Sequence, residues 1–116
     1  PKILSSQVTA VGQLNGSNGA VSFTPDLSRG SVQAVPFTST LSLTINNPVG
    51  ASEGDSFILV LANNNSATAI TPVFGTAFIL FGEPIMPIAS GKRAMYRFSV
   101  LPNFAYVLEL QRVGFT

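Results

Sequence analysis

The sequence predicts an all-β fold, an antiparallel β-sandwich or jelly roll of about seven to nine short strands with little or no helix. Apolar residues recur with period two in several segments, and turn-forming Gly, Pro and Asn recur about every 8 to 12 residues. No window of about eleven residues keeps the helical apolar spacing without a Pro, a Gly or a β-branched run. The 116 residues suit a single domain, residues 7–116, preceded by a possible N-terminal arm at residues 1–6.

Several short strands are expected in the N-terminal half of the chain. Residues 41–46 alternate strictly, which predicts that Leu41, Leu43 and Ile45 face a core. Pro48 ends this strand because proline donates no ladder hydrogen bond. Three weaker strands, separated by loops rich in Gly, Asn and Pro, are expected at residues 7–11, 20–24 and 31–37.

The middle of the chain contains apolar segments that are too short for helices. Residues 57–61 are apolar at every position, which is typical of a strand covered on both faces. Pro72 interrupts residues 69–74 and places them at an edge or a bulge. Residues 78–81 predict a further short apolar strand.

The C-terminal region predicts a β-hairpin. Its first strand alternates over residues 94–101, a turn candidate follows at Pro102 and Asn103, and its second strand spans residues 104–113. Alternation along the second strand places Glu109 and Gln111 on the face opposite its apolar residues. The residues expected to face the core are Ala94, Tyr96, Phe98, Val100, Tyr106, Leu108 and Leu110.

Composition argues against catalysis. The chain has no His, Cys or Trp and only 6 basic and 5 acidic residues, so acids, bases, nucleophiles and metal ligands are scarce. The sequence therefore predicts a protein that is not an enzyme, with no catalytic residue, cofactor or metal ion. A net charge of +1 predicts no nucleic-acid partner. The lack of a long apolar run predicts no membrane span.

Two charged groups each leave two interpretations open. Glu53 and Asp55 flank a glycine, so they form either a cation site or a solvated turn that keeps the next strand soluble. Lys92, Arg93 and Arg97 form either a solvated surface or a contact patch for carboxylates of a partner protein.

Two apolar groups exceed what one small core needs. Residues 78–81 and 84–88 are almost entirely apolar, so they either contact another chain or fold back onto the core. The same choice applies to Phe104, Tyr106 and Phe115 near an edge strand. The predicted protein interface consists of Phe78, Ile79, Phe81, Ile85, Met86, Ile88, Arg97 and Phe115.

Residues 31–115 resemble the small β-sandwich domains of tailed-bacteriophage virion proteins, namely capsid decoration (cement) proteins and tail fibre domains. The resemblance is carried by a strand and Asn-Pro turn, a Gly followed by an all-apolar strand, a Thr-Pro segment and a closing strand. These lie at residues 40–48, 54–61, 71–72 and 106–110.

The resemblance implies a structural virion protein, assembled in the host cytoplasm as a symmetric homo-oligomer, with a trimer favoured. It would bind the major capsid protein or another virion protein and stabilise the shell through protein–protein contacts. The alternative is a tail fibre or spike domain that binds a host-surface receptor or glycan. The polar loops rich enough for that role are residues 15–18 and 63–65.

Overall fold

The computed structural model describes residues 8–16 and 19–116, so the arm expected at residues 1–6 lies outside the described residues. The described chain is all-β, as the sequence predicts, and its one helical element is a 3₁₀ turn, η1 (Leu27–Arg29). The strands are β1 (Val8–Ala10), β2 (Leu14–Asn15), β3 (Ala20–Phe23), β4 (Val32–Thr38), β5 (Ser42–Ile45), β6 (Ser56–Asn63), β7 (Val73–Phe74), β8 (Phe78–Ile79), β9 (Arg93–Leu101) and β10 (Ala105–Phe115).

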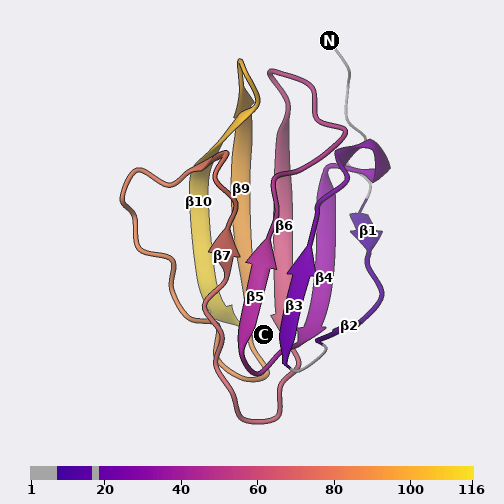
Figure 1. Ribbon diagram of the computed structural model, residues 1–116, viewed down its shortest axis with the longest axis vertical. Helices are drawn as coiled ribbons and strands as arrows, with labels where there is room; N and C mark the ends of the chain where they lie inside the picture. Colours follow the sequence, from indigo (N-terminus) through magenta and orange to yellow (C-terminus); the bar gives the residue numbers. More distant parts are fainter. Residues whose placement is uncertain (1–7, 17–18) are drawn as a thin grey trace.

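The strands form two sheets that face each other. The large sheet has seven strands in the order β1-β4-β6-β9-β10-β8, with β2 also paired to β4. The small sheet has three strands in the order β3-β5-β7 and lies over one face of the large sheet (Figure 1). The core fills the space between them.

The prediction of an antiparallel fold is wrong for most of the strand pairs. From β3 to β7 the chain crosses between the two sheets at every connection, so strands stack on earlier strands in parallel, in a solenoid-like coil. Val21 pairs with Leu43 in the small sheet, and Val35 pairs with Leu61 in the large sheet. Only the β6–β9 and β9–β10 pairs are antiparallel among the described strands.

The connection between β4 and β5 shows why a short loop does not make a hairpin here. Ser39 is buried, and its hydroxyl lies within hydrogen-bond distance of the backbone carbonyls of Gly19 and Ser42, next to strands β3 and β5 of the small sheet. Its backbone N–H donates to the Asn65 side chain at 2.9 Å. These hydrogen bonds stabilise a connection in which the chain passes from the large sheet to the small sheet within a few residues.

Alternation along the strands places the predicted residues in the core, with two exceptions, Leu41 and Leu110. Leu43 and Ile45 are fully buried, whereas Leu41 precedes the strand and is 71% exposed. In β6 the alternation is real, because Ile58 and Val60 face outward and are only half-buried. The prediction that both faces of this strand are covered is therefore wrong.

Aromatic rings fill the end of the core beneath β7 and β8. Phe57 stacks on Phe98 with ring centroids 5.2 Å apart, and Phe78 meets Phe98 edge-on at 4.9 Å. Phe74 contacts Tyr96 at 5.3 Å. Such ring pairs stabilise the fold beyond their buried area by about 0.5–1.5 kcal/mol each.

A bulge at Glu109 changes which side chains of β10 face the core. The β9–β10 register shifts between Leu108 and Leu110, so Gln111 comes opposite the inward Tyr96. Leu110 comes opposite the outward Arg97. The predicted hairpin is confirmed, but the predicted inward direction of Leu110 and outward direction of Gln111 are wrong.

Candidate functional site

The apolar segment singled out in the sequence forms a strap, defined here as residues 80–89, alongside β10. It begins after β8 of the large sheet and ends near Ile88, which forms an isolated antiparallel bridge with Ile70. Gln111 fixes it: the amide oxygen accepts from the Met86 N–H at 3.0 Å. The amide nitrogen donates to the Pro84 carbonyl at 3.2 Å and to a Glu83 carboxylate oxygen at 3.3 Å. Side-chain hydrogen bonds from Gln111, and not strand pairing, therefore hold the strap against β10, and the bridge to Ile70 holds its end.

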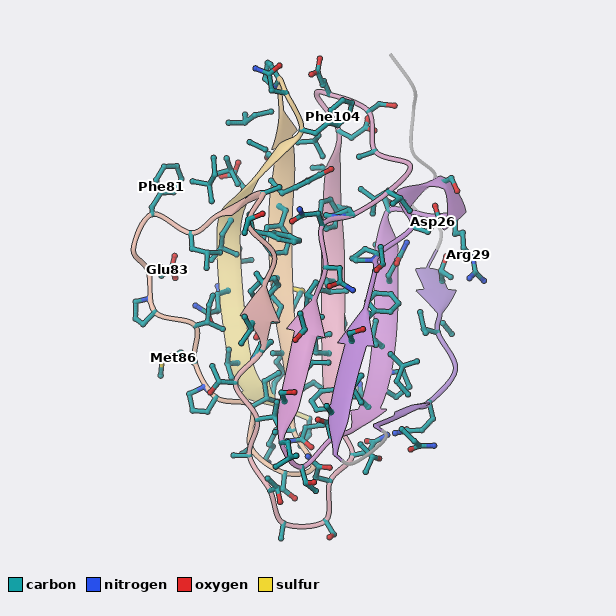
Figure 2. All side chains as sticks on the ribbon, in the orientation of Figure 1. Asp26, Arg29, Phe81, Glu83, Met86 and Phe104 are labelled. Carbon is teal, nitrogen blue, oxygen red and sulfur yellow. The ribbon has the colours of Figure 1, made fainter. Side chains whose placement is uncertain are left out.

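The strap presents apolar side chains to solvent. Phe81 is 77% exposed and Met86 is 50% exposed, and Figure 2 shows both side chains projecting away from the sheets. Ile85 is half-buried and packs against the core. A hollow of about 570 Å³ lies between the strap and the second half of β10, lined in part by Met86, Gln111 and Val113.

Phe81 has an unusual backbone conformation for an exposed aromatic residue. Its φ is 55° and that of Gly82 is 70°, and the turn is closed by a hydrogen bond from the Glu83 N–H to the Leu80 carbonyl at 2.9 Å. The left-handed conformation costs a residue with a side chain about 1–2 kcal/mol. Phe104, at the β9–β10 turn, has the same φ of 55° and is also exposed.

The eight predicted interface residues fall into three groups. Phe81, Met86, Arg97 and Phe115 are exposed, and Ile79 and Ile85 are half-buried. Phe78 and Ile88 are buried in the core, so for these two the chain adopts the core alternative. The eight do not form one patch, because Arg97 lies on the outer face of the large sheet and the strap lies beyond its β10 side. In the second apolar group Phe104 is exposed and Tyr106 is buried.

The carboxylates of Glu53 and Asp55 accept hydrogen bonds from backbone N–H groups in two loops. Glu53 accepts a hydrogen bond from the Asn103 N–H at 2.6 Å, and Asp55 accepts one from the Ser52 N–H at 3.0 Å. Within residues 8–16 and 19–116, no group of three or more acidic side chains is placed to hold a metal ion.

The asparagine loop considered for glycan binding is largely internal. Asn63 and Asn65 are buried, and the Asn63 amide nitrogen donates to the carbonyls of Ile88 at 2.8 Å and Thr68 at 2.9 Å. The Asn65 amide bonds the backbone of Ser39 through both its oxygen and its nitrogen. These amides tie the strap end to the β4–β5 connection and are not presented to a ligand.

A second surface, which we call the outer face, is the side of the large sheet turned away from the small sheet. On β9 it carries Arg93, Met95 and Arg97, and the register places Arg112 of β10 directly beside Met95. The sequence indicated Arg93 and Arg97 as a group but not Arg112. The Glu109 bulge turns Arg112 to this face, and simple alternation gives no sign of it.

Comparison with family models, with curated proteins and with solved structures found no match. No helix in the described part of the chain has the length and apolar character that crossing a membrane requires. The strand pairing describes an all-β chain in which a solenoid-like coil is followed by an antiparallel hairpin. Its exposed features are an apolar strap and an arginine-bearing sheet face.

Proposed function

We propose that this chain is a structural virion protein of a tailed phage, of the capsid decoration or cement kind, and not an enzyme. In this proposal it forms a symmetric homo-oligomer, with a trimer favoured, and binds the major capsid protein in the virion. The strap is a contact surface for these neighbours. The role is mechanical, because apolar area buried at joints between subunits holds a shell together.

The observation that carries the proposal is the exposure of Phe81 on a strap that hydrogen bonds from Gln111 hold against β10. A large apolar side chain that is 77% exposed gains nothing for the isolated chain, and its left-handed backbone adds a cost. Both features are explained if the ring is buried by a neighbouring subunit. The buried amides of Asn63 and Asn65 favour this function over the glycan-binding alternative.

The two-sheet packing agrees with the sandwich domains that the sequence resembles, whereas the parallel coil differs from the antiparallel pairing expected of them. Support for the phage assignment therefore comes from the sequence segments. Support for an assembly role comes from the strap.

The test is the mass of the purified chain by analytical ultracentrifugation, with co-purification on capsids and binding to a glycan array. A discrete oligomer that co-purifies with capsids at fixed stoichiometry is the expected result. The Phe81→Asp variant should keep its fold and lose this association, whereas Leu41→Asp, at an equally exposed site off the strap, should keep both. A monomer that binds glycans and ignores capsids contradicts the proposal.

A further inference from the structure

The outer face combines apolar side chains with three arginines. In one row across the sheet, Val32 lies beside Ile58, Ile58 beside Arg97 and Arg97 beside Leu110. The next row runs from Ala34 through Val60 and Met95 to Arg112, and the third runs from Pro36 through Ala62 and Arg93 to Phe115. Each row therefore has apolar side chains on β4 and β6 and one arginine, on either β9 or β10.

The three arginines occupy neighbouring positions on two adjacent strands. Arg93 and Arg97 are four residues apart on one strand, about 13 Å, and Arg112 lies on the adjacent strand at the level between them. All three are exposed. Arg93 borders a hollow of about 290 Å³ together with Ala34 and Val60, and Arg97 borders one of about 310 Å³ together with Ile58.

The carboxylates of the chain are all used within it. Its 5 acidic residues all lie in the described part and each accepts a hydrogen bond from a neighbour in the fold. Asp26 accepts from Ser28, Glu53 from Asn103, Asp55 from Ser52, Glu83 from Gln111 and Glu109 from Ser99. By contrast, Arg93, Arg97 and Arg112 make no ion pair or side-chain hydrogen bond with any other described residue.

We propose that the outer face is a docking surface for another protein that presents carboxylates among apolar side chains. Carboxylates of the partner would form bidentate hydrogen bonds with the arginines. Apolar side chains of the partner would pack against the apolar residues between the arginines. The outer face has one carboxylate of its own, Glu109, which accepts a hydrogen bond from the Ser99 hydroxyl. The other four acidic residues are dispersed, and Figure 2 shows Asp26 and Glu83 on opposite sides of the molecule, so a second copy of this chain does not supply three carboxylates together. The partner is therefore a different protein.

A phosphate polymer fits this face less well than a protein does. It would pair with the arginines but leave Ile58, Val60 and Met95 against charged backbone. In these rows the one aromatic side chain is Phe115, beside Arg93, so the face offers no series of rings on which successive bases could stack.

The size of the face sets the strength of one contact. Four strands and about six residues along each cover roughly 20 by 20 Å, or about 400 Å². A stable interface buries about 800 Å² on each partner. A single copy therefore binds weakly through this face, and tight attachment requires several copies presented together.

The experiment measures binding of a fluorescein-labelled peptide of alternating Glu and Val by fluorescence anisotropy at low salt. The control peptide alternates Gln and Val. The proteins are the full chain, the triple variant Arg93→Gln, Arg97→Gln, Arg112→Gln, and the matched control Arg29→Gln, whose exposed arginine lies on η1. We expect the full chain and Arg29→Gln to bind the acidic peptide alike and the triple variant to bind about tenfold or more weakly.

Thermal melting of each variant establishes that it is folded, and Arg97→Gln alone replaces the triple variant if that does not fold. Absence of binding to the acidic peptide, or equal binding by the triple variant, overturns the proposal. Equal binding of the Gln-Val peptide also overturns it, because charge would then play no part. Tighter, arginine-dependent binding of oligothymidylate or of phosphatidylserine vesicles would make the face a phosphate site. The Phe81→Gly variant separates the two proposals, since a strap contact predicts unchanged peptide binding.

Discussion

Replacing Phe81 with glycine tests the proposed contact role of the strap separately from the folding of the chain. Glycine accepts the φ of 55° at this position without steric cost, and the turn keeps its hydrogen bond from the Glu83 N–H to the Leu80 carbonyl. The substitution therefore removes the exposed ring and leaves the strap in place. Its expected effect is on contact with neighbours only.

The magnitude follows from the exposed area. A phenylalanine side chain offers about 200 Å², of which 77% is exposed, so complete burial by a neighbour is worth about 4 kcal/mol. Allowing for ordering costs, loss of the ring weakens association by about 2–4 kcal/mol, roughly 30-fold to nearly 1,000-fold in dissociation constant. For the isolated fold, about 1–2 kcal/mol of relieved backbone cost is offset by about 0.5–1 kcal/mol of glycine entropy.

The assay pairs sedimentation equilibrium, for the association constant, with urea denaturation of the dissociated chain, for the free energy of unfolding. We expect weaker association and an unfolding free energy that is unchanged or higher by up to about 1 kcal/mol. Leu41→Ser is the matched control, because Leu41 is 71% exposed and lies off the strap.

Unchanged association in Phe81→Gly refutes the role given to the ring. A loss of stability greater than about 1 kcal/mol refutes the reasoning about its backbone, since the ring would then be supporting the fold. Equal loss of association in Leu41→Ser would show that any exposed apolar residue matters, and the strap would have no special role.

Three further changes test the core. Tyr96 is buried and its hydroxyl has no hydrogen-bond partner within the described residues, so Tyr96→Phe should raise the unfolding free energy near neutral pH by about 1 kcal/mol, measured by urea denaturation. Burial also raises the pKa of Tyr96 well above its ordinary value of 10, so the unfolded chain loses this proton first. Stability that is fully present below about pH 10 then falls above it by up to about 1.4 kcal/mol per pH unit, and Tyr96→Phe should reduce that slope; an unchanged slope contradicts this. Asn65→Ala leaves the Ser39 N–H and carbonyl unpaired and should cost about 2–3 kcal/mol, whereas Asn64→Ala, at an exposed neighbour, should cost less than about 1 kcal/mol. Ile85→Asp places a charge against the core and should lower the melting temperature, unlike Met86→Asp at the exposed position beside it; equal melting temperatures would show that Ile85 is not packed.

The faces of most strands could be predicted from alternation alone. Tyr96 and Phe98 point inward as the pattern indicates, and Pro72 lies next to the edge strand β7 as its missing N–H requires. Period two reports which side chains share a face and contains no information about which strand lies alongside. The choice between a hairpin and a crossover to the other sheet depends on buried contacts such as those of Ser39 with Asn65, which are remote in sequence.

The candidate surfaces were predictable only in part, for the same reason. The apolar excess of the strap is visible in the sequence, but whether Phe81 or Phe78 is exposed depends on where β8 ends. The arginine face required the Glu109 bulge, which shifts Arg112 by one side-chain position. An inserted residue reverses the direction of the side chains after it, here as far as the second register shift between Val113 and Phe115, and alternation alone marks neither shift.

The placement of β9 has a consequence for synthesis of the chain. This strand lies between β6 and β10 in the large sheet, although it follows all the strands of the coil in sequence. Until residues 93–115 emerge from the ribosome, β6 has an open edge and the ring of Phe57 lacks Phe98 beneath it. A nascent or truncated chain therefore exposes the unpaired edge of β6, which is prone to aggregate with other chains. Chaperones would bind this edge before the completed chain could bind a partner protein.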